Sequence, residues 1–368
     1  MIFQTLFYIG IGFATILFGT AIRSIKSFKY SKLLFIILVF SLFAFLSGFK
    51  STSIGRDTSS YLEGFNHLSK TGWTQMRFGN FELGYCLLMK IFGKLGLSFQ
   101  IFNIFIYFVS YTLFAIAIYF LADDYVVATF LFYIFMFCFG LSAQRMFFSI
   151  SIISFAMIFL RGKKALNCII FAALVIVAYF FHKTSIVALL LIPLSFLKLN
   201  DKRFILSIVL IGILFVLCVP LYKFFIYKIY LSSYLPTTGG TGLLFWILLL
   251  LVISLYIFII VNRKQTRVSN YIFEGNVLDF KKIQFNFWIS LLGIAFMAFT
   301  PASENFPRFF YEFCIGIILV ISYEVSCIKN RKFKFLLYVV IIILFTIFMF
   351  VTVLHNDPLK IMPYRLFF

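Results

Sequence analysis

Charged side chains are scarce in this chain: only 12% of its 368 residues are charged, whereas 63% are hydrophobic. A soluble globular domain is about a quarter charged and about half apolar. The mean hydropathy of +1.07 expresses the same imbalance. A soluble protein is therefore excluded, because the surplus of apolar side chains must face lipid. We expect an all-α integral membrane protein.

Motifs for several common chemistries are also missing. No GxxxxGK[ST] phosphate-binding loop occurs, so ATP hydrolysis within this chain does not drive its activity. The six cysteines show no CxxC spacing, and the chain has three histidines and no HExxH motif. These patterns argue against a disulfide framework and a histidine-rich metal site. We expect no cofactor and no metal ligands, although a divalent ion could share the work of the cations discussed below.

Acidic residues are few: 12 Asp and Glu stand against 32 Lys and Arg, which gives a net charge of +20. The basic residues do not gather into a groove-like patch, so nucleic acid is not an expected partner. They fall in short clusters between apolar runs, where signals of membrane topology belong.

Apolar runs follow one another along the whole chain, and we expect a single polytopic membrane domain over residues 1–368. A helix needs about 20 residues to cross the hydrocarbon core. The first run has no basic segment before it and no clear cleavage site, so it is expected to be a span and not a removed signal peptide. The twelve expected spans are residues 2–22, 33–49, 99–121, 126–141, 146–160, 165–181, 184–197, 204–222, 243–262, 285–300, 309–328 and 335–354.

The basic clusters predict the orientation of these spans. The loops 23–32, 161–164, 198–203, 263–284 and 329–334 together hold 19 Lys or Arg residues. If they are cytoplasmic, the spans alternate with both termini outside. The loop 122–125 would then also be inside, without support from charge. External loops are expected at 50–98 and 223–242. The alternation requires that residues 81–98 lie at the membrane interface and do not cross.

A polar stretch, "STSIGRDTSSYLEGFNH" (residues 51–67), stands in the large external segment. Asp57 has two candidate roles there: it could cap a helix that begins in this stretch, or its carboxylate could take part in chemistry. The two roles are compatible.

Ionisable residues interrupt apolar runs at three short external connections, and each has two interpretations. Arg145 is either an arginine that extends from a helix end toward the interface or an anion ligand in a cavity. His182, beside Lys183, is either a packing residue or part of a site. Arg308 either pairs with Glu312 four residues later or binds an anion.

The order of these motifs resembles the EpsG family of Wzy-type polysaccharide polymerases. The resemblance rests on "GRDTSSYLEGF", on "FELGYCLLMKIFG", on an arginine that opens a span in "QRMFFSISIISF", and on "FFHKTSIVALL", over about residues 50–195. The later part resembles the family only in hydropathy and in "PRFFYEF". The first half is also similar to type C glycosyltransferases, whose first external loop carries an acidic residue and juxtamembrane helices. Such helices would correspond to residues 58–70 and 82–96.

The resemblance implies a glycosyltransferase at the external (periplasmic) face of the bacterial inner membrane. Its substrates would be oligosaccharide repeats linked to undecaprenyl pyrophosphate, joined into O-antigen, capsule or exopolysaccharide. An acceptor hydroxyl would attack the anomeric carbon and expel the lipid pyrophosphate, with inversion. The lipid bilayer is a further partner, and a chain-length regulator and a flippase are candidate partners.

Such a reaction needs a base for the hydroxyl and cations for the pyrophosphate. The candidate bases are, in order, Asp57, Glu82 and Glu304. The candidate cations are Arg145, His182 with Lys183, and Arg308, with Arg56 assisting. Tyr61, Trp73 and Tyr85 are candidates for stacking on sugar rings.

Two other functions fit parts of the pattern. A flippase of lipid-linked sugars would also have many spans and no ATPase, but it usually carries internal repeats, and none is clear here. A membrane glycan acyltransferase is the second alternative, but no plausible constellation for histidine-based acyl transfer is present.

Overall fold

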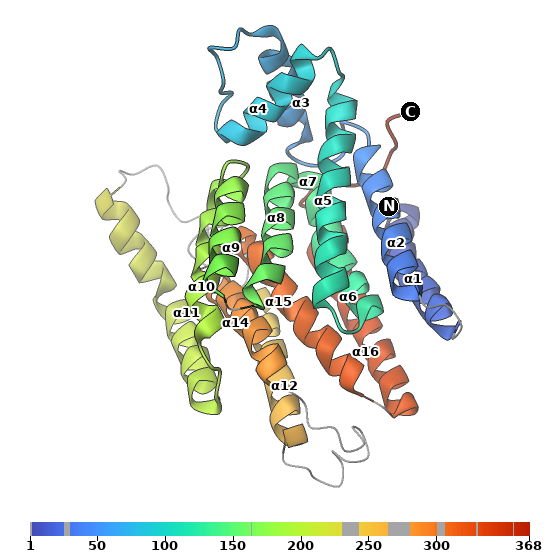
Figure 1. Cartoon of the computed structure of the whole chain (residues 1–368), viewed down its shortest axis with the longest axis vertical. Helices are drawn as coiled ribbons and strands as arrows, with labels where there is room; N and C mark the ends of the chain where they lie inside the picture. Colours follow the sequence, from blue (N-terminus) through green and yellow to red (C-terminus); the bar gives the residue numbers. More distant parts are fainter. Residues whose placement is uncertain are drawn as a thin grey trace. The chain divides into compact units, whose positions relative to one another are not determined.

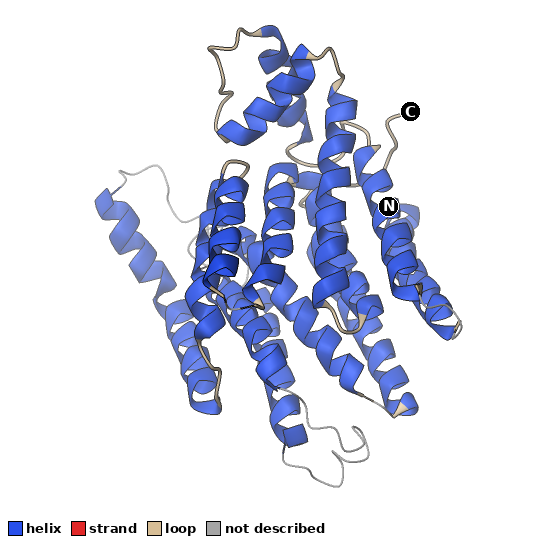
Figure 2. Cartoon of the chain, in the orientation of Figure 1, coloured by secondary structure: helices blue, strands red, loops and turns tan. Residues whose placement is uncertain are grey.

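The computed structural model describes residues 2–25, 30–162, 164–229, 243–263, 280–299, 306–328, 330–355 and 357–368. Helices make up 81% of the structure, and no strand is drawn in the described chain (Figure 2). This agrees with the all-α membrane fold that the composition predicts.

Six helical segments are long and apolar enough to cross a membrane: Phe3–Ser24, Ser31–Gly48, Phe99–Leu121, Tyr125–Ser142, Arg308–Cys327 and Arg331–Leu354. Shorter apolar helices cover Gln144–Leu160, Ala165–Tyr179, Lys183–Phe196, Phe245–Phe258 and Ile283–Met297. Together with α11, helical segments overlie each of the expected spans. The structure thus fits a multi-pass protein, and the number of twelve spans stays a prediction.

The described chain divides into two compact units, and the single membrane domain stays a prediction. The first unit comprises Met1–Leu189 and Phe335–Phe368, and the second Leu190–Lys334. The helices of the first unit are α1 (Ile2–Ser24), α2 (Ser31–Gly48), α3 (Thr58–Lys70), α4 (Leu83–Lys94), α5 (Phe99–Leu121), α6 (Tyr125–Phe132), α7 (Cys138–Ser142), α8 (Gln144–Leu160), α9 (Ala165–Tyr179) and most of α16 (Arg331–Met349) (Figure 1).

The second unit contains α10 (Leu191–Phe196), α11 (Asp201–Ile229), α12 (Leu243–Arg263), α14 (Phe280–Met297) and α15 (Phe306–Cys327). Parts of two expected loops are helical. Residues 223–229 belong to α11, Arg263 to α12 and residues 280–284 to α14, and whether these residues lie outside the membrane stays a prediction. The remaining parts of those loops, 230–242 and 264–279, lie outside the described residues.

The expected juxtamembrane helices of the external segment are present as α3 and α4. α4 has 12 residues, which at about 1.5 Å per residue is too short to cross the hydrocarbon core. Its Lys90 is fully buried and donates hydrogen bonds to the carbonyl oxygens of Gly72 and Gln75, the latter at 2.7 Å. The charged side chain thereby fixes the loop between the two helices.

The loops of the first unit lie at its two ends. Each end holds loops that the basic clusters assign to the same side of the membrane. At one end, the Tyr364 amide donates to Gln4 Oε1 (2.9 Å) and the Ser51 amide to Arg365 O (2.8 Å). Both termini therefore lie beside the start of the segment 50–98, as Figure 1 shows. Which end faces the cytoplasm stays a prediction.

At the opposite end, Arg23 and Asp124 form a bidentate ion pair with N–O distances of 2.7 and 2.9 Å. Asp124 also caps α6 by accepting hydrogen bonds from the Val126 and Val127 amides. Lys32 Nζ donates to Ala122 O at 3.1 Å. The loop 122–125 thus lies beside the basic loop 23–32. Its own charges did not predict on which side of the membrane it lies.

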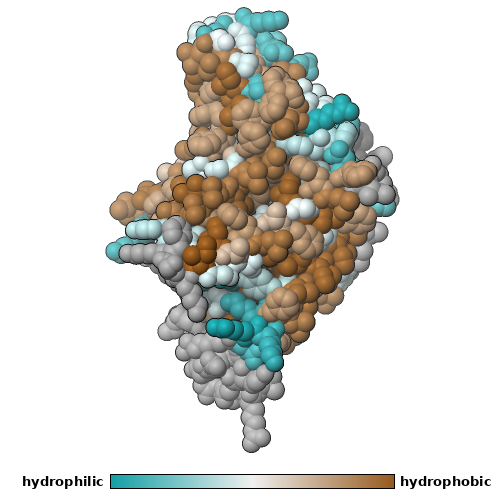
Figure 3. All heavy atoms as spheres, turned by 90° about the vertical axis from the view of Figure 1, so that its right-hand side faces the viewer, coloured by the Kyte–Doolittle hydropathy of each residue, from teal (hydrophilic) through white to brown (hydrophobic). Residues whose placement is uncertain are grey.

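Hydrophobic side chains cover much of the helix surface. Phe3, Leu17 and Ile37 are among the exposed residues, and Figure 3 shows hydrophobic side chains over the middle of one face, with hydrophilic ones near its top and again in its lower part. Inside the first unit, α5 packs between α2 and α8 through aromatic residues. Tyr111, for example, lies 5.1 Å from the ring of Phe147 and 6.1 Å from that of Phe43.

Candidate active site

Glu82 is the centre of a polar cluster in the first unit, at the end that carries α3 and α4. The residue directly precedes α4 in an extended conformation and is 8% exposed. Its Oε2 accepts a hydrogen bond from Arg145 Nη1, while its Oε1 lies 3.3 Å from the Lys183 amide and 3.5 Å from His182 Nδ1. Three segments that are remote in sequence thus meet at one carboxylate.

The start of α4 is held against the end of α9 by a glycine. The Gly84 amide donates to Phe180 O at 2.9 Å. A Cβ atom at Gly84 would lie only 2.8 Å from that same oxygen. The absence of a side chain therefore lets Glu82 come within reach of His182 and Lys183.

Arg145 lies at the start of α8, where the helical run breaks after α7. The break leaves the terminal carbonyl groups of α7 without partners in their own helix. Tyr107 Oη donates to Gly140 O at 2.7 Å, and Lys50 Nζ donates to Leu141 O at 2.6 Å. These hydrogen bonds stabilise the break and so present Arg145 to Glu82.

The guanidinium of Arg145 lies over aromatic rings. Its Cζ is 4.4 Å from the ring centre of Phe81 and 5.8 Å from that of Tyr61. Its hydrogen bonds to Glu82 and Asn80 O both use Nη1. Nε is buried, so Nη2 is the nitrogen that these two acceptors leave for a ligand, and a charged N–H donor of this kind suits a phosphate oxygen.

Asp57 occupies the residue before α3, but its carboxylate makes no capping hydrogen bond to that helix. The side chain is half-buried, and Tyr61 Oη approaches Asp57 Oδ2 at 3.5 Å. Because Arg145 lies against the same tyrosine ring, Tyr61 connects Asp57 to the Glu82 cluster. Asp57 therefore occupies the predicted N-cap position, but the predicted capping hydrogen bond is absent from α3, so the capping interaction is wrong in this structure.

Lys50 is a member of the site that our sequence interpretation missed. Its Nζ donates to Ile54 O (2.8 Å), Thr58 Oγ1 (2.7 Å) and Leu141 O, and its side chain is buried. Burial lowers the pKa of Lys50 to about 7, and the charge of Asp57 opposes part of that decrease. Nothing in the sequence marked Lys50 as buried, since it directly follows a span where basic residues normally face water.

A second missed element is a buried chain of amide and hydroxyl groups. Tyr85 Oη donates to Gln144 Oε1 (2.7 Å), Gln144 Nε2 to Asn103 Oδ1 (2.8 Å), and Asn103 Nδ2 to Gly48 O (2.9 Å). This chain of hydrogen bonds joins α4, which Glu82 directly precedes, to α8, α5 and the end of α2. The spacing of these residues in the sequence does not predict that their side chains lie together.

The predicted residues for sugar stacking separate into two kinds. Tyr61 and Tyr85 are 2% and 0% exposed. The stacking prediction is therefore wrong for both in this structure, because packing with Phe81 and Phe102 covers their rings. Trp73 is 56% exposed on the loop between α3 and α4 and retains a free face, so its stacking role stays a prediction.

The other predicted site residues are placed as follows. The side chains of Arg56 and Lys183 are exposed, and Lys183 meets Glu82 through its backbone amide. Arg308 is exposed near the start of α15 in the second unit, where its role stays a prediction. Glu304 lies outside the described residues. Among those that are described, no group of three or more His, Cys, Asp or Glu residues could hold a metal ion.

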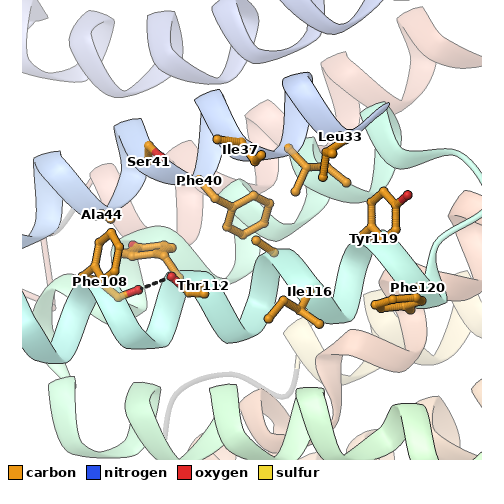
Figure 4. Close-up of a pocket in the computed structure, with 13 residues that line it drawn as sticks. Leu33, Ile37, Phe40, Ser41, Ala44, Phe108, Thr112, Ile116, Tyr119 and Phe120 are labelled. Atoms are coloured by element: carbon orange, nitrogen blue, oxygen red, sulfur yellow. Dashed lines mark hydrogen bonds between the residues drawn. The ribbon is translucent and has the colours of Figure 1, made fainter. Parts of the chain in front are cut away.

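A cavity of about 410 Å³ lies elsewhere, between α2 and α5 (Figure 4). Leu33, Ile37 and Phe40 line it from α2, and Ile116 and Phe120 from α5. None of its lining residues is a carboxylate or a cation. Its chemistry therefore suits hydrocarbon and not a reacting sugar.

Comparison of the chain with curated proteins and with solved structures gives no match. A family model described as the EpsG family matches residues 4–366. The matched region includes the whole Glu82 cluster, the Asp57 loop and both units. The chain therefore belongs to the EpsG family, whose members are similar to Wzy-type polysaccharide polymerases.

Proposed function

We propose that this protein polymerises oligosaccharide repeats carried on undecaprenyl pyrophosphate, at the external face of the bacterial inner membrane. Membership of the EpsG family supports a polymerase-like role. The observation that carries the chemistry is the cluster of Glu82, Arg145 and His182, with Asp57 beside it, at one end of the first unit.

The two carboxylates suit different tasks. Glu82 accepts hydrogen bonds from Arg145 and from the Lys183 amide, so its charge is already compensated. Asp57 has only the long contact with Tyr61 Oη among its side-chain hydrogen bonds in the site. A base must have a lone pair available for the incoming proton. Asp57 is therefore the stronger candidate for the base, and Glu82 the group that orients the cations.

In the proposed reaction, an acceptor hydroxyl attacks the anomeric carbon of the donor glycan and gives its proton to Asp57. The bond between that carbon and the pyrophosphate oxygen breaks, and both of its electrons leave with the lipid pyrophosphate. Arg145 stabilises the negative charge on that leaving group, and His182 with Lys183 lies beside it as the next candidate for this role. Direct displacement inverts the configuration at the anomeric carbon.

Exposed residues in and near the loop between α3 and α4 support the proposed binding of a lipid-linked glycan. Trp73 offers an exposed ring for a sugar, and the exposed Arg56 precedes Asp57 in the same loop. The basic exposed residues Arg77 and Lys183 suit an anionic lipid carrier.

The test is the length of the surface glycan in a strain that lacks the gene. Loss of a polymerase should collapse the ladder of chain lengths to a single repeat, because export and ligation continue. Loss of all surface glycan would instead indicate a flippase of lipid-linked units. An unchanged ladder would contradict the proposed function.

A further inference from the structure

The last residues of the chain form a strap against the loop that carries Asp57. After α16 and the π-helical turn Phe350–Leu354, residues 357–368, here called the C-terminal strap, turn back along residues 49–57. Lys50 and Leu366 form an antiparallel bridge. The hydrogen bonds between the two segments are Phe367 N to Phe49 O (2.8 Å), Ser51 N to Arg365 O (2.8 Å), Gly55 N to Lys360 O (2.8 Å) and Arg56 N to Leu359 O (2.9 Å).

The strap is shaped and attached independently of the loop. Within the strap, both carboxylate oxygens of Asp357 accept backbone hydrogen bonds, from the Ile361 amide (2.7 Å) and the Met362 amide (3.0 Å), and so hold its first turn. The buried Tyr8 Oη of α1 donates to Ile361 O at 2.8 Å. Tyr364 Oη donates to Leu46 O in α2 at 2.6 Å. The strap is thus fixed to the first two membrane helices, and its carbonyl groups are presented to the loop.

The loop is held from its other side by Lys50, which donates to Ile54 O and Leu141 O, and by Ser142. Gly55 has a positive φ of 94°, and a Cβ atom there would lie 2.2 Å from Leu141 O. The Arg56 amide also points to Ser142 Oγ at 3.0 Å. The two amides that immediately precede Asp57 therefore both donate to strap carbonyls, one of them jointly with Ser142.

We infer that the C-terminal strap is a positioning element for Asp57, with Asp357 as its key positioning residue. The backbone of residues 55 and 56 determines where the Asp57 carboxylate points, and the strap fixes that backbone from one side while Lys50 and Ser142 fix it from the other. This inference rests on the proposed function for its effect on catalysis, but the contact between strap and loop does not. Catalytic groups displaced by about 1 Å lose roughly 10²-fold in rate.

The experiment uses Asp357→Ala in the full-length protein, with the exposed Glu63→Ala as the matched removal of a carboxylate from the same external region. Hydrogen exchange measured by mass spectrometry should show at least about 10-fold faster exchange in residues 51–56 of Asp357→Ala, since the amides of Ser51, Gly55 and Arg56 lose the strap carbonyls. At matched protein levels, Asp357→Ala should shorten the glycan ladder. Glu63→Ala should leave both readouts as in the wild type.

A covalent tether separates positioning from general stability. Ser51→Cys and Arg365→Cys place two thiols at paired backbone positions, and mass spectrometry of the joined peptide reports the disulfide. In the Asp357→Ala background, the oxidised tether should restore slow exchange and long ladders, and reduction should remove both. The same two cysteines with Asp357 intact should support long ladders whether oxidised or reduced.

Two results would overturn the inference. Unchanged exchange of residues 51–56 in Asp357→Ala would show that the anchor does not hold the strap on the loop. Faster exchange with a ladder of normal length would show that the strap does not position the reaction. Failure of the proposed function is distinguishable, because the ladder would then survive deletion of the whole gene while the exchange result for the strap remained.

Discussion

Asp57 and Glu82 are both carboxylates that stand directly before a helix, yet their surroundings differ. Glu82 is buried and compensated by Arg145 and the Lys183 amide. Asp57 is half-buried and leaves its helix uncapped. The contrast gives two neighbouring acids different tasks, one as the base and the other as the group that orients cations.

The base assignment predicts that Asp57→Asn abolishes elongation without loss of folding. The amide has the same shape but cannot take a proton, and the loss of a general base typically costs about 10²–10⁴-fold in rate. Because the carboxylate makes no cap hydrogen bond, α3 should be unaffected. Glycan length in membranes with matched protein levels is the measurement. A normal ladder from this variant would remove Asp57 from the role of base and leave Glu82 as the next candidate.

Arg145 is predicted to need its guanidinium and not merely its charge. Arg145→Lys retains a cation but cannot hold Glu82 and a phosphate oxygen with a planar fork, so polymerisation should fall at least about 10-fold. Arg161→Lys is the matched control, because Arg161 ends the same helical segment and its Nη2 bonds only the backbone at Leu121 O (2.7 Å). Equal activity of the two variants would contradict the role of Arg145.

Lys50 gives the folded protein a pH dependence whose sign follows from its pKa. Burial lowers that pKa to about 7 from an ordinary value of 10.5. Between these pH values the unfolded chain binds more protons than the folded protein. The free energy of unfolding therefore rises with pH across this window, by up to about 1.4 kcal/mol per pH unit.

The measurement is thermal unfolding in detergent from pH 6 to 9, for the wild type and for Lys50→Met. Methionine cannot titrate, so the difference in stability between the two proteins should grow in favour of the wild type as the pH rises above 7. Parallel curves over the whole range would show that Lys50 is not a titrating group in this window.

At the scale of elements, the contact between α4 and the end of α9 sets the site geometry. Gly84→Ala would place Cβ at 2.8 Å from Phe180 O, so α4 must move and carry Glu82 away from the Lys183 amide. We expect a shorter ladder with the protein still inserted in the membrane. Gly72→Ala is the control, since the nearest atom to its Cβ would be at 3.8 Å. A wild-type ladder from Gly84→Ala would show that this contact is not needed.

Elements were predictable from the sequence where one physical signal dominated. Hydropathy indicated the apolar helices and the external segment between residues 49 and 99, and the resemblance to type C glycosyltransferases implied the two helices within that segment. Arg145 and His182 were found because charges beside apolar runs are costly and therefore need a reason, and Glu82 because its segment resembles the EpsG family. Lys50 and Gln144 were missed because their roles depend on tertiary partners, Leu141 O and Asn103, that no local pattern reveals.

For the molecule as a whole, the orientation in the membrane is the first property to test. Ser59 is exposed on α3, and Lys164 is exposed beside the start of α9. With the predicted orientation, Ser59→Cys should react with an impermeant thiol reagent in intact spheroplasts, and Lys164→Cys should react only after lysis. Labelling of Lys164→Cys in intact cells would reverse the orientation and place the site on the cytoplasmic face.

The pairing of residues 49–56 with residues 357–368 also orders events in time. The loop with Asp57 leaves the ribosome well before residues 357–368, which hold it. Residues 357–368 must therefore be made, and must reach the same side of the membrane as the loop, before the hydrogen bonds of Gly55 and Arg56 can form. A chain that stops before residue 357 would be inserted without these contacts and so without a completed site.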